Sequence, residues 1–517
     1  MKRIWTLLLC LAMLLSLLAG CNLQADAPYV PTGDGLTWDE DYTGPTQAAT
    51  QPDDTQVLNL TYYPEKGMNP YDCVDFTNRA LFSLLYQSLF IVDRDYNVEP
   101  MLCNRYSRSS DMKTHVFYIV SNATFSDGTL LTAADVVASL DTAEDSDMYS
   151  GRFQYIDDIY LADDGGVVVE TSTAYENLPL LLDIPIIRQD QQEADYPLGT
   201  GPYAMDNTSG TMRLRRRNDW WCNATLLITS PSIALSEAKS ASQIRDEFEF
   251  ADLSLVCADP GSDRYADYRC DYELWDSENG IFVYLSCNLE SDVFSNPEVR
   301  AALTYAIDRD TLAETYYRGF ARGVTLPASP LSPYYSQVLA QQYGFDNVKF
   351  AQAVSDAGMT NYTVTLLVNS DDSLRVRVAR AIGKMLTECG LQVEMKEVGS
   401  SAYVEALRYQ TYDLYLGQTK LSATMDLSAF FSSSGALNYG RFGDVAAYTL
   451  CKEALANHGN YYTLHKTVMD DGRLCPVVFR SYAVYATRGL LTGLTPSRDN
   501  VFYYSLGRSM ESALITE

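Results

Sequence analysis

Histidine is scarce in this sequence, with only three among 517 residues, so few side chains are available as a general base or a metal ligand. The sequence motifs of serine hydrolases, zinc proteases and phosphate-binding loops are absent as well. His458 and His465 lie seven positions apart and could share one helix face, but ordinary surface or cap roles are the better interpretation. These absences predict a protein that is not an enzyme, with no catalytic residue, no metal and no cofactor.

Positive charge is also in short supply. The chain has 38 Lys and Arg against 67 Asp and Glu, a formal net charge of -29 and a pI near 4.4. Such a balance repels phosphate backbones, so we expect no nucleic-acid partner. We interpret the acidity as a property that keeps the protein soluble.

Cysteine forms no Cys-x-x-Cys pair, so neither a zinc ribbon nor a redox motif is predicted. Of the eleven cysteines, Cys10 and Cys21 lie in the N-terminal segment, and the nine others cannot all pair within the chain. The sequence leaves any disulfide connectivity open.

The main hydrophobic run lies at the N-terminus. Positive charge at residues 1–3 precedes apolar residues 4–18, a stretch shorter than the roughly 20 residues that span a bilayer. The run ends in Leu18-Ala19-Gly20-Cys21, the small residues and cysteine at which bacterial lipoproteins are cut and lipidated. We expect residues 1–21 to be a lipoprotein signal peptide with Cys21 as the lipidation site. A single membrane-spanning anchor is the alternative.

The rest of the chain divides into a tether and a folded body. Residues 22–56 are rich in proline, threonine, glycine and acids and contain no lysine or arginine, so they cannot bury enough apolar surface to fold. We expect a flexible tether there. The folded body that follows the tether is too long for one hydrophobic core, so we expect two or three domains.

Hydrophobic periodicity predicts an α/β body. Residues 58–62 alternate as a strand does, and residues 76–89 have helical spacing. Turn residues predict two hairpins, which join 159–162 to 167–171 and 201–205 to 211–217.

The clearest pattern is a βαβαβ unit, which implies a parallel sheet whose ligands bind beyond the carboxyl ends of the strands. Its strands are expected at 363–368, 391–395 and 412–417 and its helices at 378–389 and 402–409, with Gly390 as a C-cap glycine.

Two helix starts are marked by capping signals. Thr132 and Asp135 have the spacing of a capping box. Asn296-Pro297-Glu298 combines an N-cap residue, a proline at the first helical position and an acid at the positive end of the helix. We interpret these residues as structural.

Several motifs resemble those of family 5 solute-binding proteins, the oligopeptide-binding subunits of ABC importers. The densest is Phe125-Ser126-Asp127-Gly128-Thr129-Leu130-Leu131-Thr132-Ala133-Ala134-Asp135-Val136, which is similar to the family signature "FsDGtplTAeDV". Further blocks follow in the family's order: residues 199–203 (GTGPY), 217–221 (RNDWW), 288 with 296–303 and 306–309 (N, NPEVRAAL, AIDR), and 390–393 with 412–414 (GLQV, YDL).

The resemblance implies an α/β fold of the type II periplasmic-binding-protein kind, with two lobes that close on a ligand and an extra domain inserted in the first. Lobe one is expected at 57–274 plus 473–517, with the insert at about 90–170, and lobe two at 275–472. Strands that cross near Asn279 and Arg473, with the return through residues 476–485, would form the hinge.

The expected contact region is the loop at 418–426, where the third strand of lobe two ends. Peptide binders of this family usually carry an aspartate there that pairs with the ligand's ammonium group. This chain has Lys420, Ser422 and Asp426 instead, without the tryptophan and proline of the family pattern. Asp426 is a candidate substitute, and the alternative is that it caps the helix that starts near Leu427, a common role for aspartate. Lys420 points to a pocket that prefers an anion.

Tyrosines provide further candidates for the ligand site. Tyr149 lies near the position where family members place a cleft-facing tyrosine, and Tyr63 follows the first strand. Either could stack on a ligand or hydrogen-bond to it, but packing in the core is the alternative for both.

Together these features predict a lipid-anchored binding component of an ABC importer on the extracytoplasmic face of the cell membrane. We expect a monomer that captures a solute, in the first place a peptide, and delivers it to the permease subunits. The alternatives are a binder of a non-peptide or anionic solute, a surface sensor and a secreted hydrolase. The hydrolase would need two acids that converge in the cleft at about 5–9.5 Å.

Overall fold

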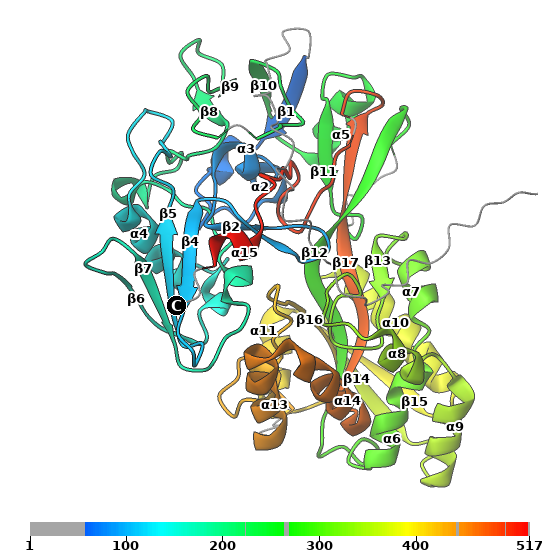
Figure 1. Ribbon diagram of the computed structural model, residues 1–517. Coiled ribbons are helices and arrows are strands. Elements are labelled where there is room, and N and C mark those ends of the chain that lie inside the picture. Colours follow the sequence, from blue (N-terminus) through cyan, green and yellow to red (C-terminus); the bar gives the residue numbers. More distant parts are fainter. Residues whose placement is uncertain (1–56, 223, 263–267, 441–443, 492, 515–517) are drawn as a thin grey trace, which may run out of the picture. The chain divides into compact units, whose positions relative to one another are not determined.

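The computed structural model describes residues 57–222, 224–262, 268–440, 444–491 and 493–514 (Figure 1). The predicted signal peptide, the lipidation site Cys21 and the tether lie outside these residues. Among the helices of the described part, none has both the length and the apolar character needed to cross a membrane.

The described residues begin in a four-stranded sheet ordered β1-β10-β9-β8. The first strand, β1 (Leu58–Tyr62), lies where alternation predicts it and pairs in parallel with β10 (Ser232–Glu237). The hairpin of β8 (Tyr203–Asp206) and β9 (Arg213–Arg216) confirms the second predicted hairpin.

A second four-stranded sheet, ordered β4-β5-β7-β6, falls largely in the predicted insert. Its strands are β4 (Cys103–Arg108), β5 (Thr114–Ile119), β6 (Ile156–Leu161) and β7 (Val167–Thr171). The antiparallel pairing of β6 with β7 confirms the first predicted hairpin. The short hairpin of β2 (Phe90–Val92) and β3 (Val98–Pro100) precedes this sheet.

The helix predicted over residues 76–89 is wrong in its length. The chain forms two single turns instead, α2 (Phe76–Arg79) and α3 (Phe82–Leu85), and is extended at Tyr86. The Leu85 carbonyl accepts a hydrogen bond from the Gly201 backbone, and Gln87 bridges to Ile186. These tertiary backbone bonds outweigh the local helical preference.

The largest sheet has seven strands and contains the βαβαβ unit. Strand β14 (Thr363–Asn369) pairs in parallel with both β15 (Gln392–Val398) and β16 (Leu414–Lys420), as predicted. The connecting helices are α10 (Ser373–Glu388) and α11 (Ser400–Tyr409). Gly390 follows α10 with φ +101°, the left-handed conformation expected of a C-cap glycine.

Two long strands complete this sheet. β12 (Tyr272–Cys287) and β17 (Leu474–Thr487) run side by side and antiparallel (Figure 1), and β17 also pairs with β11 (Leu255–Ala258) and β13 (Ala321–Gly323). The pairing shifts register between Glu278 and Phe282, where Gly280 has φ +73°. The predicted crossing points therefore fall in or next to paired strands of one sheet.

The hydrophobic side chains collect into several cores. One contains mostly residues between 58 and 257 together with residues 484–504, and a second contains residues 283–478. A third joins Val92, Tyr96 and Leu180 to residues between 282 and 479. The exact limits of the two lobes and of the insert stay a prediction.

Two of the remaining helices begin where capping signals predict them. The capping box of Thr132 and Asp135 opens the helix predicted there, and Asn296 caps a helix that starts at Pro297, as expected. The remaining helices are α4 (Ala133–Asp145), α5 (Ala241–Glu249), α6 (Pro297–Ala302), α7 (Arg309–Thr315), α8 (Gln337–Ala340), α9 (Asn347–Asp356), α12 (Ser428–Phe431), α13 (Val445–Ala456), α14 (Tyr461–Asp471) and α15 (Met510–Ala513).

Candidate functional site

The predicted contact loop begins later than expected. Gln418 to Lys420 still belong to β16 and pair with Val283 to Ile281 of β12, so the loop proper starts at Leu421. The strand extends because β12 continues beside it. Lys420 is consequently held at the carboxyl end of a central strand, where parallel sheets present side chains to ligands.

Lys420 is part of a charged group that we call the Asp499 cluster: Arg79, Lys420, Arg498 and Asp499. The Lys420 Nζ lies 2.5 Å from Asp499 Oδ2, and Arg79 Nη2 lies 2.7 Å from Asp499 Oδ1. One carboxylate thus binds two cations, one from α2 and one from the end of β16.

Burial and neighbouring charges shift the pKa values of this cluster. Burial alone would raise the pKa of Asp499, but Arg79, Lys420 and Arg498 outweigh it and hold that pKa well below its usual range. Burial lowers the pKa of Lys420 to about 8, although Asp499 opposes the change. The Lys420 side chain still exposes 33 % of its surface, so solvent reaches it.

Asp426 contacts the start of α12 from the position before the N-cap residue, which is Leu427. Its Oδ1 accepts hydrogen bonds from the Ser428 backbone N–H at 3.0 Å and from the Ser428 hydroxyl at 2.6 Å, at the start of α12. Burial raises the pKa of Asp426, and the bonds from Ser428 oppose the rise. A role in ligand binding stays a prediction for this residue.

Ser422 lies in a chain of hydroxyl groups that links the loop to the predicted first lobe. Its Oγ is 2.9 Å from Thr424 Oγ1, which lies 3.0 Å from the Tyr175 hydroxyl. The Tyr155 hydroxyl donates to Ser428 Oγ at 2.5 Å. The segment that follows β16 is therefore bonded to residues of the predicted first lobe.

Tyr149 lies close to the Asp499 cluster. The ring is buried, 5 % exposed, and the Arg152 guanidinium lies 4.9 Å from its centre. Burial raises the Tyr149 pKa to about 12, against the opposing charges of Arg79 and Arg152. Tyr149, Arg79 and Asp499 line the same cavity of about 80 Å³.

Tyr63 lines a different cavity, together with Thr77, Cys257 and Asp259. Its backbone N–H donates to Asn78 Oδ1 at 2.7 Å, and Asn78 Nδ2 donates back to the Tyr63 carbonyl at 2.9 Å. A ligand contact at Tyr63 stays a prediction.

Sequence reasoning missed Arg79, Arg498 and Asp499. Asp499 is 79 positions from Lys420, and Arg79 belongs to a segment read only as part of a helix. No motif or spacing relates these residues, because sheet assembly brings them together.

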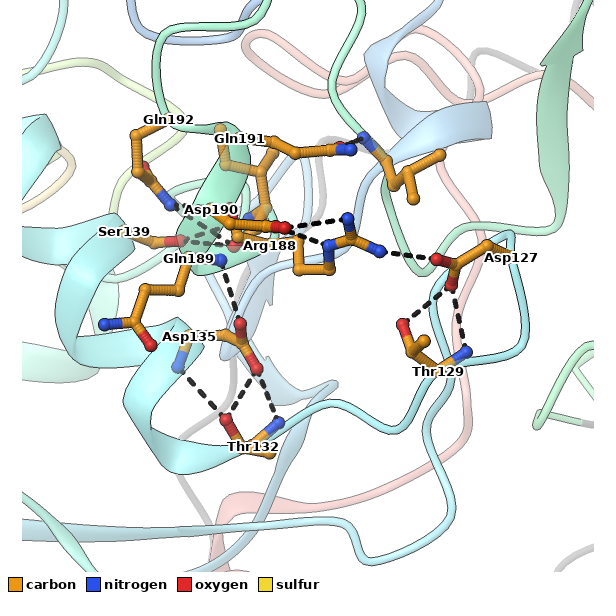
Figure 2. Close-up of polar contacts among 12 residues, drawn as sticks. Asp127, Thr129, Thr132, Asp135, Ser139, Arg188, Gln189, Asp190, Gln191 and Gln192 are labelled. Atoms are coloured by element: carbon orange, nitrogen blue, oxygen red, sulfur yellow. Dashed lines mark hydrogen bonds and ion pairs between the residues drawn. The ribbon is translucent and has the colours of Figure 1, made fainter.

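The family-like motif at residues 125–136 has structural contacts, as expected. Figure 2 shows Asp135 accepting hydrogen bonds from the Thr132 and Gln189 backbones, at 2.8 and 2.9 Å. Asp127 accepts from Thr129 and pairs with Arg188. The motif therefore fastens the start of α4 to residues 188–192.

Comparison with solved structures supports this fold. The ABC transporter substrate-binding protein CtaP from Listeria monocytogenes matches with a TM-score of 0.70 at 17 % identity, covering 89 % of this chain and 99 % of that chain. HbpA2 from Haemophilus parasuis matches with a TM-score of 0.72 at 17 % identity, covering 87 % and 99 %. At these identities the likeness shows the fold, an α/β architecture of the type II periplasmic-binding-protein kind.

Sequence comparison gives the family. The glutathione-binding protein GsiB from Escherichia coli K12 is 25 % identical over 355 residues, which cover 63 % of this chain and 66 % of that protein. The match thus spans just under two thirds of the relative's length. The model of bacterial extracellular solute-binding proteins, family 5 Middle, matches residues 97–439. The chain belongs to the family 5 extracellular solute-binding proteins.

Proposed function

We propose that this protein is the solute-binding component of an ABC importer, which captures a ligand between two lobes and delivers it to the permease. The observation that carries the proposal is the position of Lys420. It lies at the carboxyl end of a central strand and is joined to Asp499 of the other predicted lobe. Binding of solute by this family and the glutathione-binding relatives support the same role.

The lobes of this proposal are residues 57–274 with 473–517, carrying an insert at about 90–170, and residues 275–472. The separate cores at opposite ends of β12 and β17 support the division. The third core and the Lys420–Asp499 pair are then contacts between lobes, as expected of a closed form.

The ligand we propose first is a peptide. Glutathione is the solute in the name of the relative GsiB, so it is the first compound to test. A hydrolase has less support, because both oxygens of Asp499, the one acid of the Asp499 cluster, are already ion-paired.

Calorimetric titration and ligand capture test this function. Purified protein should bind glutathione or a member of a tripeptide pool, and mass spectrometry of the natively purified protein should find the same class of solute. Deletion of the gene should abolish uptake of that solute and leave uptake of an unrelated amino acid unchanged. Binding without any loss of uptake would favour a surface sensor, and absence of any captured solute would contradict both roles.

We also propose that Cys21 anchors the protein to the membrane through lipid. The support is the sequence Leu18-Ala19-Gly20-Cys21 after an apolar run. Cys21→Ser should abolish labelling by a fatty-acid probe and release the protein from the membrane fraction. Cys10→Ser, in the predicted signal peptide, is the matched control and should leave both unchanged. Continued labelling of the Cys21→Ser protein would contradict the anchor.

A further inference from the structure

The cavity beside the Asp499 cluster contains buried polar atoms without partners. Among the described residues, Ser83 Oγ, Arg498 Nε and Asn500 Oδ1 make no hydrogen bond, and all three residues line this cavity of about 80 Å³. Arg498 is only 5 % exposed. Asp499 Oδ1 also makes no hydrogen bond, but it is ion-paired with Arg79. Buried polar groups are nearly always bonded, so the three atoms without any partner around one space indicate an absent partner.

The guanidinium of Arg498 is held so that Nε remains available. Its Nη1 donates to the Tyr96 hydroxyl at 3.4 Å and its Nη2 to the Leu421 carbonyl at 3.3 Å. Both acceptors are neutral. Glu278 accepts a hydrogen bond from the same Tyr96 hydroxyl at 2.6 Å. Its carboxylate interacts electrostatically with Arg498.

The backbone of Arg498 is fixed as well. It has φ +42°, an unfavourable conformation for a residue with a side chain, and its carbonyl accepts a hydrogen bond from Ser277 of β12 at 3.1 Å. Ser497 next to it donates to the Val92 carbonyl at 2.6 Å. Strain of this kind persists where the surrounding structure requires a side chain in one place.

The charge around the cavity favours an anion. The cavity is lined by Arg79, Arg152 and Arg498 against the carboxylates of Asp183 and Asp499, an excess of one positive charge within a chain of net charge -29. Outside the lining, Lys420 pairs with Asp499, and Glu278 interacts with Arg498. Arg152 is already paired with Asp183. A cationic excess in a largely buried space is stabilised by an anion of the ligand.

We propose that this cavity is the subsite for a carboxylate group of the solute, with the Arg498 Nε–H and the Ser83 hydroxyl as donors. Asn500 can add a third donor because its amide can present either the oxygen or the NH₂ group. The volume of about 80 Å³ has room for a carboxylate and for further atoms of the ligand, since a single water needs only about 10–15 Å³ of such space. The inference rests on the proposed solute-binding function, whose ligand class it narrows to carboxylate-bearing solutes.

Titration with succinate at constant ionic strength tests the subsite, with sodium chloride as the reference anion and ethylene glycol as a neutral probe. The wild-type protein should bind succinate and not ethylene glycol. Arg498→Gln should weaken succinate binding at least tenfold. Arg488→Gln is the matched control, because that arginine is exposed and pairs with Asp271, and it should change affinity less than twofold.

A second variant keeps the test decisive if Arg498→Gln does not fold. Asn500→Asp is nearly isosteric and places a negative charge against the bound carboxylate, so it should also lower the affinity for succinate at least tenfold. Asn207→Asp, at an exposed position, is the control and should leave that affinity unchanged. The subsite proposal is overturned if succinate binds to the wild type no better than chloride. It is also overturned if a folded Arg498→Gln or Asn500→Asp protein binds succinate as well as the wild type does.

The outcomes also separate this inference from the proposed function. A protein that captures a natural solute but fails the succinate test retains its function and loses the subsite. A protein that binds succinate as expected but captures no solute from cells keeps the subsite and contradicts the importer role.

Discussion

His465 is a fully buried histidine whose two ring nitrogens make no hydrogen bond with any described residue. Its nearest ring partner is Tyr461, edge-on at 5.7 Å. Burial lowers the pKa of His465 from 6.5 to about 3. The sequence could not separate this position from His458, which is exposed and paired with Glu176.

Replacing His465 with leucine should stabilise the protein by about 1 kcal/mol at pH 7, because an apolar side chain leaves no buried polar atom unpaired. Below about pH 6 the unfolded chain binds a proton at His465 that the folded protein does not, so wild-type stability falls with decreasing pH by up to about 1.4 kcal/mol per unit from this residue. Urea unfolding between pH 4 and pH 8 measures both effects.

The variant should lose part of that acid sensitivity and not all of it, because His115, with a pKa lowered by burial to about 4, acts in the same direction. Thr463→Leu, at an exposed position of the same helix, is the control and should leave the pH slope unchanged. An identical slope for wild type and His465→Leu would contradict the buried neutral histidine.

Lys420 and Asp426 were predicted as alternative contacts for the polar end of the ligand. Since Asp426 is engaged by Ser428 and Lys420 lies in the Asp499 cluster, Lys420→Met should weaken solute affinity about tenfold or more. Asp426→Asn should change affinity less. Wild-type affinity should also fall as pH rises through about 8, because Lys420 then loses its proton.

Calorimetry on both variants across pH 6.5–9 checks this expectation, with Lys384→Met as the control for an exposed lysine that pairs with Glu388. A large loss in Asp426→Asn with none in Lys420→Met would reverse the assignment and indicate a ligand held by its ammonium group.

At the scale of elements, the motif at residues 125–136 acts through Asp135. This side chain is 6 % exposed and accepts bonds from two backbone N–H groups and from the Thr132 hydroxyl. In Asp135→Asn an NH₂ group must face one of these donors, which should lower the free energy of unfolding by about 1.5–3 kcal/mol. Urea unfolding gives that value, and solute affinity should not change.

Asp127→Asn is the matched comparison in the same motif. Its side chain is 34 % exposed, so the loss should stay below about 1 kcal/mol. Reduced solute affinity in a folded Asp135→Asn protein would mean that the motif contributes to the ligand site and not only to the fold.

Hydrophobic periodicity along the sequence predicted some helices and strands correctly and others not. The βαβαβ unit was predictable because each strand and helix carries its own hydrophobic period, and because parallel strands need helical crossovers. Residues 76–89 have an equally helical pattern, but Gly201 binds the Leu85 carbonyl and ends the helix. That glycine lies more than a hundred residues away, beyond any local window.

At the scale of the whole molecule, we expect solute to close the two lobes about β12 and β17. Small-angle scattering should show a smaller radius of gyration with saturating solute than without. Gly280 is the position to change, because a Cβ there would lie 3.2 Å from both terminal nitrogens of Arg498 in addition to the strain of φ +73°. Gly280→Ala should reduce both the compaction and the affinity.

Gly319→Ala separates the effect of the contact with Arg498 from the effect of backbone strain. Gly319 has a similar φ of +81° but no atom within 4 Å of its Cβ position, so this variant should retain closure at a similar cost in backbone strain. A radius of gyration that does not change at saturation in the wild type would contradict a closing cleft.

The sequence by itself determined the family, the βαβαβ unit and the caps of its helices, because periodicity, capping residues and the 125–136 motif are local in the chain. It also placed Lys420 and Tyr149 among the candidates. Only the tertiary structure decided which charges meet: Arg79 and Asp499 reach Lys420 from opposite ends of the chain, and Arg498 is fixed beside Gly280 by β12. The physical reason is that ion pairs and buried orphan atoms depend on the distance between side chains in space, and the packing of distant strands and loops sets that distance.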